Sequence, residues 1–163
     1  MSPIQITAER YEQGEIIPGF AIPSITRFLD MRVESHDTAA AVLCLSFSTR
    51  PEYANPHNSV NGGILAAMLD DAMNCLILAQ TGGSKLQVST DLHTSFFRPA
   101  PIGPRVTVVA RIDRIGRSVA FTSAEALNDK GEVLARAVHT AAFIQPPTNP
   151  AGAGSGSASR RAT

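Results

Sequence analysis

The chain of 163 residues has no excess of charge of either sign and few cysteines. Fourteen Lys and Arg residues balance fourteen Asp and Glu residues, so nothing predicts a basic surface for nucleic acid or an anionic membrane. The two cysteines, Cys44 and Cys75, each lie in an apolar run, and no second Cys or His stands at metal-ligand spacing from either. We therefore expect buried free thiols, no metal site, and small-molecule or protein partners.

Long hydrophobic runs are also missing. A helix that spans a bilayer needs roughly 20 apolar residues, whereas the run over 64–79 is interrupted by two aspartates and an asparagine. The first residues lack the basic segment and apolar run of a secretion signal. The length suits one domain of common size. These features predict one cytoplasmic domain over residues 1–145, without a membrane-spanning segment. Residues 146–163, rich in Pro, Gly, Ala and Ser, are expected to form a disordered tail.

Apolar spacing and turn residues predict an α+β fold. A short helix is expected over 24–29, then one or two strands within 31–47 with a hairpin turning at His36 and Asp37. A long helix follows over 61–79. Four further strands, over 86–96, 105–115, 118–127 and 133–144, are expected to form a meander. In the first of them, mostly apolar residues alternate with polar residues. This pattern predicts a half-buried strand with Ser89 on the face opposite to Leu92 and Phe96.

The long helix is apolar on nearly every side, which is typical of a helix inside a protein. An antiparallel sheet that curves around one central helix would bury it in this way. Asp70 and Asp71 lie in its middle, and a buried carboxylate is costly unless it is paired or protonated. Because neighbouring helical residues differ by about 100° in direction, we expect one aspartate to face a cleft and the other to face solvent or a partner subunit. The alternative is a narrow polar stripe shared with Asn74.

Gly62 and Gly63 precede this helix. Glycines allow a ligand to approach the backbone closely, and the first turn of a helix has N–H groups without internal partners. Such a terminus can stabilise the oxygen of a polarised carbonyl group. The alternative is that the two glycines only form a tight turn into the helix.

The segments Asn55-Pro56, Asn61-Gly62-Gly63 to Met73, and Phe96-Phe97-Arg98-Pro99-Ala100 occur in this order. Together they resemble the hot-dog-fold acyl-CoA thioesterases, in particular the PaaI-like branch of the 4-hydroxybenzoyl-CoA thioesterase superfamily. The resemblance extends over about residues 20–144. It implies a hot-dog fold, an antiparallel sheet wrapped around one long central helix.

Carried over by position, the resemblance implies that Asp70 is the general base or nucleophile and that the Gly62 N–H forms the oxyanion hole. Asn55 matches a loop asparagine that helps to hold water or the thioester, and Ser89 matches a serine or threonine after the helix. Asn61 replaces the usual His or Gln before the glycine pair, so it can donate a hydrogen bond but cannot act as an acid near neutral pH. Asp71 is expected to support the site or to contact the partner subunit.

Further residues are expected to bind the substrate. His57 is expected to line the cleft, together with Gly63 and Phe96. The phosphates of CoA would be bound by Arg98 and by the turn of Gly116, Arg117 and Ser118. The remaining histidines, His36, His93 and His139, are expected only to pack or to face solvent.

The implied reaction is hydrolysis of an acyl-CoA thioester to the free acid and CoA, with no cofactor besides the CoA of the substrate. The resemblance also implies a homodimer with active sites at the subunit boundary, paired again into a tetramer. Three alternatives remain. The chain could be a non-catalytic acyl-CoA binding or sensor module, a hot-dog dehydratase, which would need a catalytic His where Asn61 stands, or a purely structural subunit.

Overall fold

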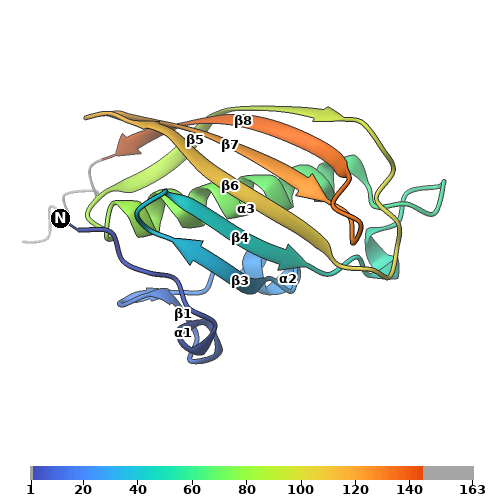
Figure 1. Cartoon of the computed structure of the whole chain (residues 1–163), viewed down its shortest axis with the longest axis horizontal. Helices are drawn as coiled ribbons and strands as arrows, with labels where there is room; N and C mark the ends of the chain where they lie inside the picture. Colours follow the sequence, from blue (N-terminus) through green and yellow to red (C-terminus); the bar gives the residue numbers. More distant parts are fainter. Residues whose placement is uncertain (1, 145–163) are drawn as a thin grey trace, which may run out of the picture.

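The computed structural model describes residues 2–144, so the tail predicted for residues 146–163 lies outside the described part. Its main feature is a six-stranded antiparallel sheet in the order β3-β4-β6-β7-β8-β5. The sheet curves around one long helix, α3, as Figure 1 shows. The strands have these bounds: β3 (Arg32–Asp37), β4 (Val42–Phe47), β5 (Leu86–Phe96), β6 (Val106–Ile115), β7 (Val119–Leu127) and β8 (Val133–Ile144). The predicted α+β architecture is confirmed.

Helix α3 (Gly62–Gln80) is the centre of the hydrophobic core. Its buried residues point in many directions, which agrees with the apolar sequence on nearly all its sides: Leu65, Met68, Leu69, Ala72, Met73, Cys75, Leu76, Ile77 and Ala79. By length and composition alone this helix could cross a membrane. In the structure the sheet packs against it, so its apolar surface is used in the core of the fold.

The N-terminal segment covers one side of α3 and the edge of the sheet at β3. It contains α1 (Ala8–Glu12), a small sheet of β1 (Glu15–Ile17) and β2 (Phe20–Ala21), and α2 (Ser24–Phe28). The predicted short helix over 24–29 is confirmed as α2, whereas α1 and the small sheet were not predicted. Figure 1 shows α1 and β1 below β3.

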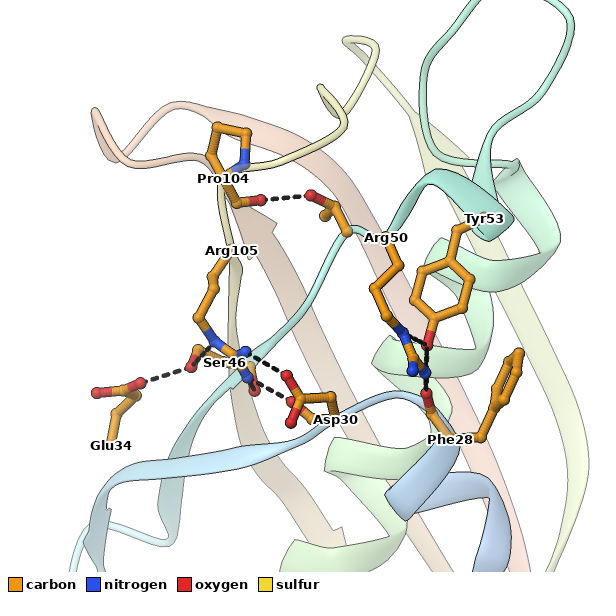
Figure 2. A network of polar contacts seen from close by, with 9 residues as sticks. Phe28, Asp30, Glu34, Ser46, Arg50, Tyr53, Pro104 and Arg105 are labelled. Atoms are coloured by element: carbon orange, nitrogen blue, oxygen red, sulfur yellow. Dashed lines mark hydrogen bonds and ion pairs between the residues drawn. The ribbon is translucent and has the colours of Figure 1, made fainter.

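Two arginine-centred networks attach the segment after α2 to the sheet and to the loop before α3, as Figure 2 shows. The Arg105 side chain forms an ion pair with Asp30, at 2.7 Å between Nη1 and Oδ2, and donates to Ser46 Oγ at 2.9 Å. Arg50 donates to the hydroxyl of Tyr53 and to the carbonyl of Phe28. These contacts fix the position of α2 against α3, which matters for the surroundings of Asp71.

The first hairpin turns later than predicted. His36 and Asp37 are the last residues of β3, and the turn covers residues 38–41. The Asp37 carboxylate accepts the backbone N–H groups of Ala39 and Ala40, at 2.9 and 2.8 Å, and so stabilises the turn that follows it.

The predicted meander is correct for β6, β7 and β8 only. β5 pairs with β8 and forms an edge of the sheet, while β6 pairs with β4. The connection over 97–105 therefore runs from one side of the sheet to the other. Because no strand within residues 2–144 pairs with the outer side of β5, most of its residues are exposed, and the prediction of a half-buried strand was wrong.

The prediction that Ser89 lies on the face of β5 opposite to Leu92 and Phe96 was also wrong. The strand register shifts between Ser89 and Asp91, so that Ser89 lies opposite the buried Ala141 of β8. A bulge of this kind reverses the alternation of side chains. Ser89 therefore shares the helix-facing side of the sheet with Leu92 and Phe96, which lie opposite the buried His139 and Ala135.

Candidate functional site

Asp70 and Asp71 point to different sides of α3. The Asp70 Oδ1 atom accepts the hydroxyl of Ser89 on β5 at 3.0 Å, whereas the Asp71 Oδ1 atom accepts the hydroxyl of Thr26 on α2 at 2.8 Å. This divergence follows from the rotation of about 100° per helical residue. The prediction that the two carboxylates take different directions is confirmed.

Asp70 belongs to a group of four polar residues that we call the Asp70 cluster: Asp70, Asn74, Ser89 and His139. The Asn74 Nδ2 atom donates to the Asp70 carbonyl at 3.0 Å and to Ser89 Oγ at 3.3 Å. The His139 Nε2 atom lies 2.9 Å from Ser89 Oγ and 3.6 Å from Asp70 Oδ1. The side chain of Asp70 remains 35% exposed, so this hydrogen-bonded carboxylate is accessible to water or to a ligand.

Two members of the cluster were missed as functional residues. His139 was expected only to pack or to face solvent, but its buried ring lies against Ser89 and next to Asp70. Asn74 was considered only as part of a polar stripe. The sequence offered one signal, since His139 alternates in step with Ala137 and Ala141, which are buried in β8. The contact with Ser89 depends on the bulge in β5, which no sequence pattern indicated.

The other two histidines fit the prediction of packing or exposure. His36 is buried in β3, and its Nδ1 atom accepts the backbone N–H of Ile6 at 3.0 Å. His93 is exposed on β5.

Asp71 faces the N-terminal segment of its own chain. It lines a small cavity of about 150 Å³ between α3 and that segment, together with Phe20, Asn74 and Cys75. Its Oδ2 atom is buried and has no hydrogen-bond partner among the described residues. The pKa of this carboxyl is raised from 3.8 to about 6, mainly by burial; the Thr26 hydrogen bond lowers it and the charge of Asp70 raises it. Asp71 therefore contacts α2 of its own chain instead of a surface that could meet a partner.

A larger cavity of about 410 Å³ opens at the N-terminus of α3. It brings together five of the predicted site residues, which are Asn55, His57, Gly62, Phe96 and Arg98. The Phe96 ring packs against Gly62 so closely that a Cβ atom on this glycine would lie 3.3 Å from the ring. Glycine at this position therefore leaves room for the Phe96 ring beside the backbone N–H, and a larger residue would require the ring to shift.

Asn61 and Gly63 have structural roles at this helix end. Asn61 is the N-cap of α3, and its Oδ1 atom accepts the Gly63 N–H at 2.8 Å. The Gly63 N–H is therefore not available to a ligand, and the contribution of Gly63 to substrate binding stays a prediction. The cap makes no contact with the N–H of Gly62, which is the first residue of the helix.

Asn55 organises its own loop. Its Oδ1 atom accepts the backbone N–H of His57 at 2.9 Å and that of Ser59 at 3.2 Å, and its Nδ2 atom donates to Ser59 Oγ at 2.9 Å. The side chain thus holds His57 at the rim of the cavity, and its amide is already used in hydrogen bonds within the loop.

The remaining predicted residues lie apart from this cavity within one chain. Asp70 follows Gly62 by eight residues along a straight helix, a rise of about 12 Å, and it does not line the cavity. Gly116, Arg117 and Ser118 form the turn between β6 and β7, where Lys85 at the start of β5 donates to the Gly116 carbonyl at 3.0 Å. Phe96 and Arg98 lie at the other end of β5. One chain therefore presents the predicted residues in three separate places.

Within residues 2–144 there is no group of three or more His, Cys, Asp or Glu side chains placed to hold a metal ion. The arrangement offers a hydrogen-bonded carboxylate, an open helix N-terminus and an apolar cavity. These are elements that could polarise a carbonyl group and activate water against it.

Comparisons with known proteins identify the family of this chain. A family model described as the thioesterase superfamily matches residues 57–135. Acyl-coenzyme A thioesterase 13 of Mus musculus is 25% identical over 122 residues, which cover 74% of this chain and 86% of that protein. Among solved structures, a phenylacetic acid degradation-related protein from Ralstonia eutropha JMP134 has a TM-score of 0.72 and 30% identity, covering 77% of this chain and 93% of its own. The PaaI protein of E. coli has a TM-score of 0.69 at 20% identity, covering 76% and 86%.

Proposed function

Because this chain belongs to the thioesterase superfamily, as a hot-dog-fold thioesterase of the PaaI-like type, we propose that it hydrolyses acyl-CoA thioesters to a carboxylic acid and free CoA. The observation that carries this proposal is the Asp70 cluster, a solvent-accessible carboxylate hydrogen-bonded to Ser89 in the middle of the helix at the centre of the hydrophobic core. Such a carboxylate has no role in the packing of the core, and its position favours a role in chemistry.

In this proposal Asp70 is the general base that activates a water, or the nucleophile that forms an acyl-enzyme anhydride. Ser89 holds the carboxylate in place through its Oδ1 atom. The second oxygen, Oδ2, accepts none of the hydrogen bonds within the cluster and is the atom that would meet the water or the thioester carbon. Either step requires the ionised form of the carboxyl group.

The Gly62 N–H is proposed to form the oxyanion hole. It stands at the first position of a helix of 19 residues, where the backbone carries partial positive charge. The Asn61 cap satisfies Gly63 instead, so Gly62 keeps its donor for a ligand. The cavity beside it, lined by Leu65, Phe96 and Phe97, could receive apolar parts of the substrate.

Two chains are needed to combine these parts. β5 is an edge strand of 11 residues, and its exposed apolar side chains include Val88, Leu92 and Phe96. Unpaired edges with apolar side chains favour pairing with another strand. Antiparallel pairing of two β5 strands around a two-fold axis near Leu92 would bring the half of one strand that carries Ser89 beside the half of the other that carries Phe96. Asp70 of one subunit would then approach Gly62 of the other.

The same pairing explains the position of the predicted CoA-binding residues. Arg117 lies near the start of β5 and Arg98 lies just after its end, so an antiparallel dimer would bring the Arg117 turn of one subunit toward Arg98 of the other. Both arginines could then contact the phosphates of one CoA molecule. We propose a homodimer of this kind that pairs again into a tetramer and acts in the cytoplasm without a metal or redox cofactor.

The function is tested by offering the purified protein a panel of aryl, phenylacetyl and medium-chain acyl-CoAs and measuring the free thiol of released CoA. Catalytic release from at least one thioester is expected. A rise in the melting temperature with acyl-CoA but no release of thiol would contradict hydrolysis and would indicate a binding module of the same fold.

A further inference from the structure

A chain of polar side chains crosses the inner face of the sheet and ends at Asp70. Thr122 of β7 and His139 of β8 are direct cross-strand neighbours, and both are buried. Thr122 Oγ1 lies 3.0 Å from His139 Nδ1, and His139 Nε2 lies 2.9 Å from Ser89 Oγ. Ser89 Oγ in turn lies 3.0 Å from Asp70 Oδ1. Buried polar groups of this kind must agree on the direction of every hydrogen bond.

The direction is fixed first at Ser89. A serine hydroxyl can donate one hydrogen bond and accept two. The carboxylate of Asp70 can only accept a hydrogen bond. The Asn74 atom next to Ser89 also contacts the Asp70 carbonyl oxygen, so it is the amide nitrogen Nδ2, which can only donate. Ser89 therefore donates to Asp70 and accepts from Asn74. The His139 Nε2 atom can contact the Ser89 oxygen favourably only if it carries a proton and donates it.

The other ring nitrogen fixes the charge of His139. Among the described residues, the Thr122 hydroxyl contacts the Nδ1 atom of His139. Its proton can be accepted by Nδ1 only if Nδ1 carries no proton itself. With a proton on Nδ1, the buried Thr122 proton would have no acceptor, which is costly. Neutral His139 with its single proton on Nε2 is therefore the form that satisfies all four side chains.

The electrostatic surroundings agree with a neutral ring. Burial lowers the pKa of His139 from 6.5, while the charges of Asp70 on α3 and Asp91 on β5 act in the opposite direction with smaller effect. Thr122 on β7 contributes a hydroxyl and no charge.

We propose that His139 is a positioning residue for thioester hydrolysis, held by Thr122 as the neutral Nε2–H form so that the Ser89 hydroxyl can donate only to Asp70. The Asp70 carboxylate is thereby held in one rotamer, with Oδ2 directed away from the cluster. His139 transfers no proton in this account. The proposal rests on the proposed role of Asp70, but the protonation state of His139 is a separate and directly measurable part of it.

The kinetic test compares two substitutions of His139. His139→Leu removes the donor to Ser89, so the Ser89 hydroxyl holds the Asp70 carboxylate less firmly. We expect kcat to fall by about tenfold or more with little change in KM, because the change affects the reacting carboxylate and not the groups proposed to bind the substrate. His139→Gln has an amide N–H near the position of Nε2 and is expected to recover most of this loss. Equal losses in the two variants, or activity of His139→Leu equal to that of the wild type, would overturn the proposal.

Thr122 offers a second pair of variants. Thr122→Val removes the hydroxyl with little change of shape and is expected to lower kcat, while Thr122→Ser keeps the hydroxyl and most of the activity. Thr140→Val is the matched control, because Thr140 is next to His139 on β8 and points to the opposite face of the sheet. A loss as large in Thr140→Val as in Thr122→Val would contradict the specific role of Thr122.

The protonation state is measured by NMR of protein labelled with ¹⁵N in its four histidines, with the His139→Gln spectrum used for assignment. A neutral ring with its proton on Nε2 at pH 7 is expected. An imidazolium, or a proton on Nδ1, would overturn the proposal even if the substituted proteins are too unstable for kinetics. A wild-type protein that releases no CoA from any thioester but shows the Nε2–H form would contradict the proposed function and the kinetic role of His139, and would leave the hydrogen-bond directions confirmed.

Discussion

The neighbouring carboxylates of Asp70 and Asp71, on two sides of α3, differ in exposure and in hydrogen bonding. Asp70 faces the unpaired edge strand β5, and its carboxylate is accessible and hydrogen-bonded. Asp71 faces α2, and its carboxylate is enclosed, with one oxygen unpartnered and a pKa of about 6. The described residues leave the outer edge of β5 unpaired, whereas the N-terminal segment covers the side of Asp71. Of the two carboxylates, only that of Asp70 lies where a substrate could reach it.

The first prediction separates the two aspartates by activity. Asp70→Asn keeps the shape of the side chain and removes the charge, so thioester hydrolysis is expected to fall by about 10²–10⁴-fold, the usual contribution of a general base. Asp71→Asn is the matched control and is expected to keep activity of the same order as the wild type. Release of CoA by both variants is measured with the same substrate. Equal losses would show that the two sides of α3 are not functionally different.

The second prediction concerns the open side itself. Leu92→Lys places a charge at the middle of the β5 edge, where the proposed two-fold axis would bring two copies close together. The dimer is expected to dissociate, and hydrolysis is expected to be lost with it, as analytical ultracentrifugation and the CoA assay would show. Ile25→Lys, which changes another exposed apolar residue, on α2, is expected to leave both the dimer and the activity unchanged. A fully active monomer would contradict the shared site.

The third prediction concerns the covered side. The pKa of Asp71 is raised in the folded protein, so the folded state binds this proton more tightly than the unfolded state does. The stability that this group contributes is present below pH 3.8 and is lost as the pH rises through about 6. Asp71→Asn should therefore be the more stable protein at neutral pH, by up to about 3 kcal/mol.

Urea denaturation of the wild type and of Asp71→Asn at several pH values checks this result. The difference in the free energy of unfolding should grow from about pH 4 to pH 7 and then level off. A constant difference across this range would contradict the raised pKa.

The smallest effect is expected at the hydrogen bond that Asp71 does make. Thr26→Val removes the hydroxyl that donates to Asp71 Oδ1, and the protein is expected to lose about 1–3 kcal/mol of stability at neutral pH with no change in activity. Thr26→Ser keeps the donor and serves as the control. In the Asp71→Asn background the loss should be smaller, and an equal loss there would show that Thr26 acts through packing alone.

Much of the fold could be predicted because it depends on local patterns. The apolar sequence of α3 indicates a central helix, and short turns such as Ile115-Gly116-Arg117 indicate the hairpins. The position of β5 could not be predicted in this way. Its pairing with β8 joins residues about 50 positions apart, as in the hydrogen bond from Thr90 Oγ1 to the Thr140 carbonyl, and nothing in the alternation of either strand specifies the other.

The candidate site was predictable where it depends on position along one element. The different directions of Asp70 and Asp71 follow from helix geometry. The position of the Gly62 N–H at the helix N-terminus follows from where the apolar helix begins in the sequence. The contact between Ser89 and His139 depends on a bulge in β5 and on the pairing of β5 with β8, so it became visible only in the structure. The free edge of β5 likewise depends on the order of the strands.

In the proposed dimer, Asp70 of one subunit acts with Gly62 of the other. Complementation between two inactive variants tests this arrangement most directly. Asp70→Asn removes the carboxylate. Gly62→Pro removes the N–H at the first position of α3, where proline fits a helix and where Asn61 has the extended conformation that proline requires (φ −57°, ψ 135°). Gly62→Ala, which adds a Cβ beside Phe96 but keeps the N–H, is the control for the contact with the ring.

Asp70→Asn and Gly62→Pro should each be inactive alone. When the two are co-expressed with different affinity tags, random pairing gives mixed dimers in which one of two sites combines an intact Asp70 with an intact Gly62, so about a quarter of the wild-type activity should return. If the mixed dimers form but remain as inactive as either variant alone, Asp70 and Gly62 do not work across the subunit boundary and the account is wrong.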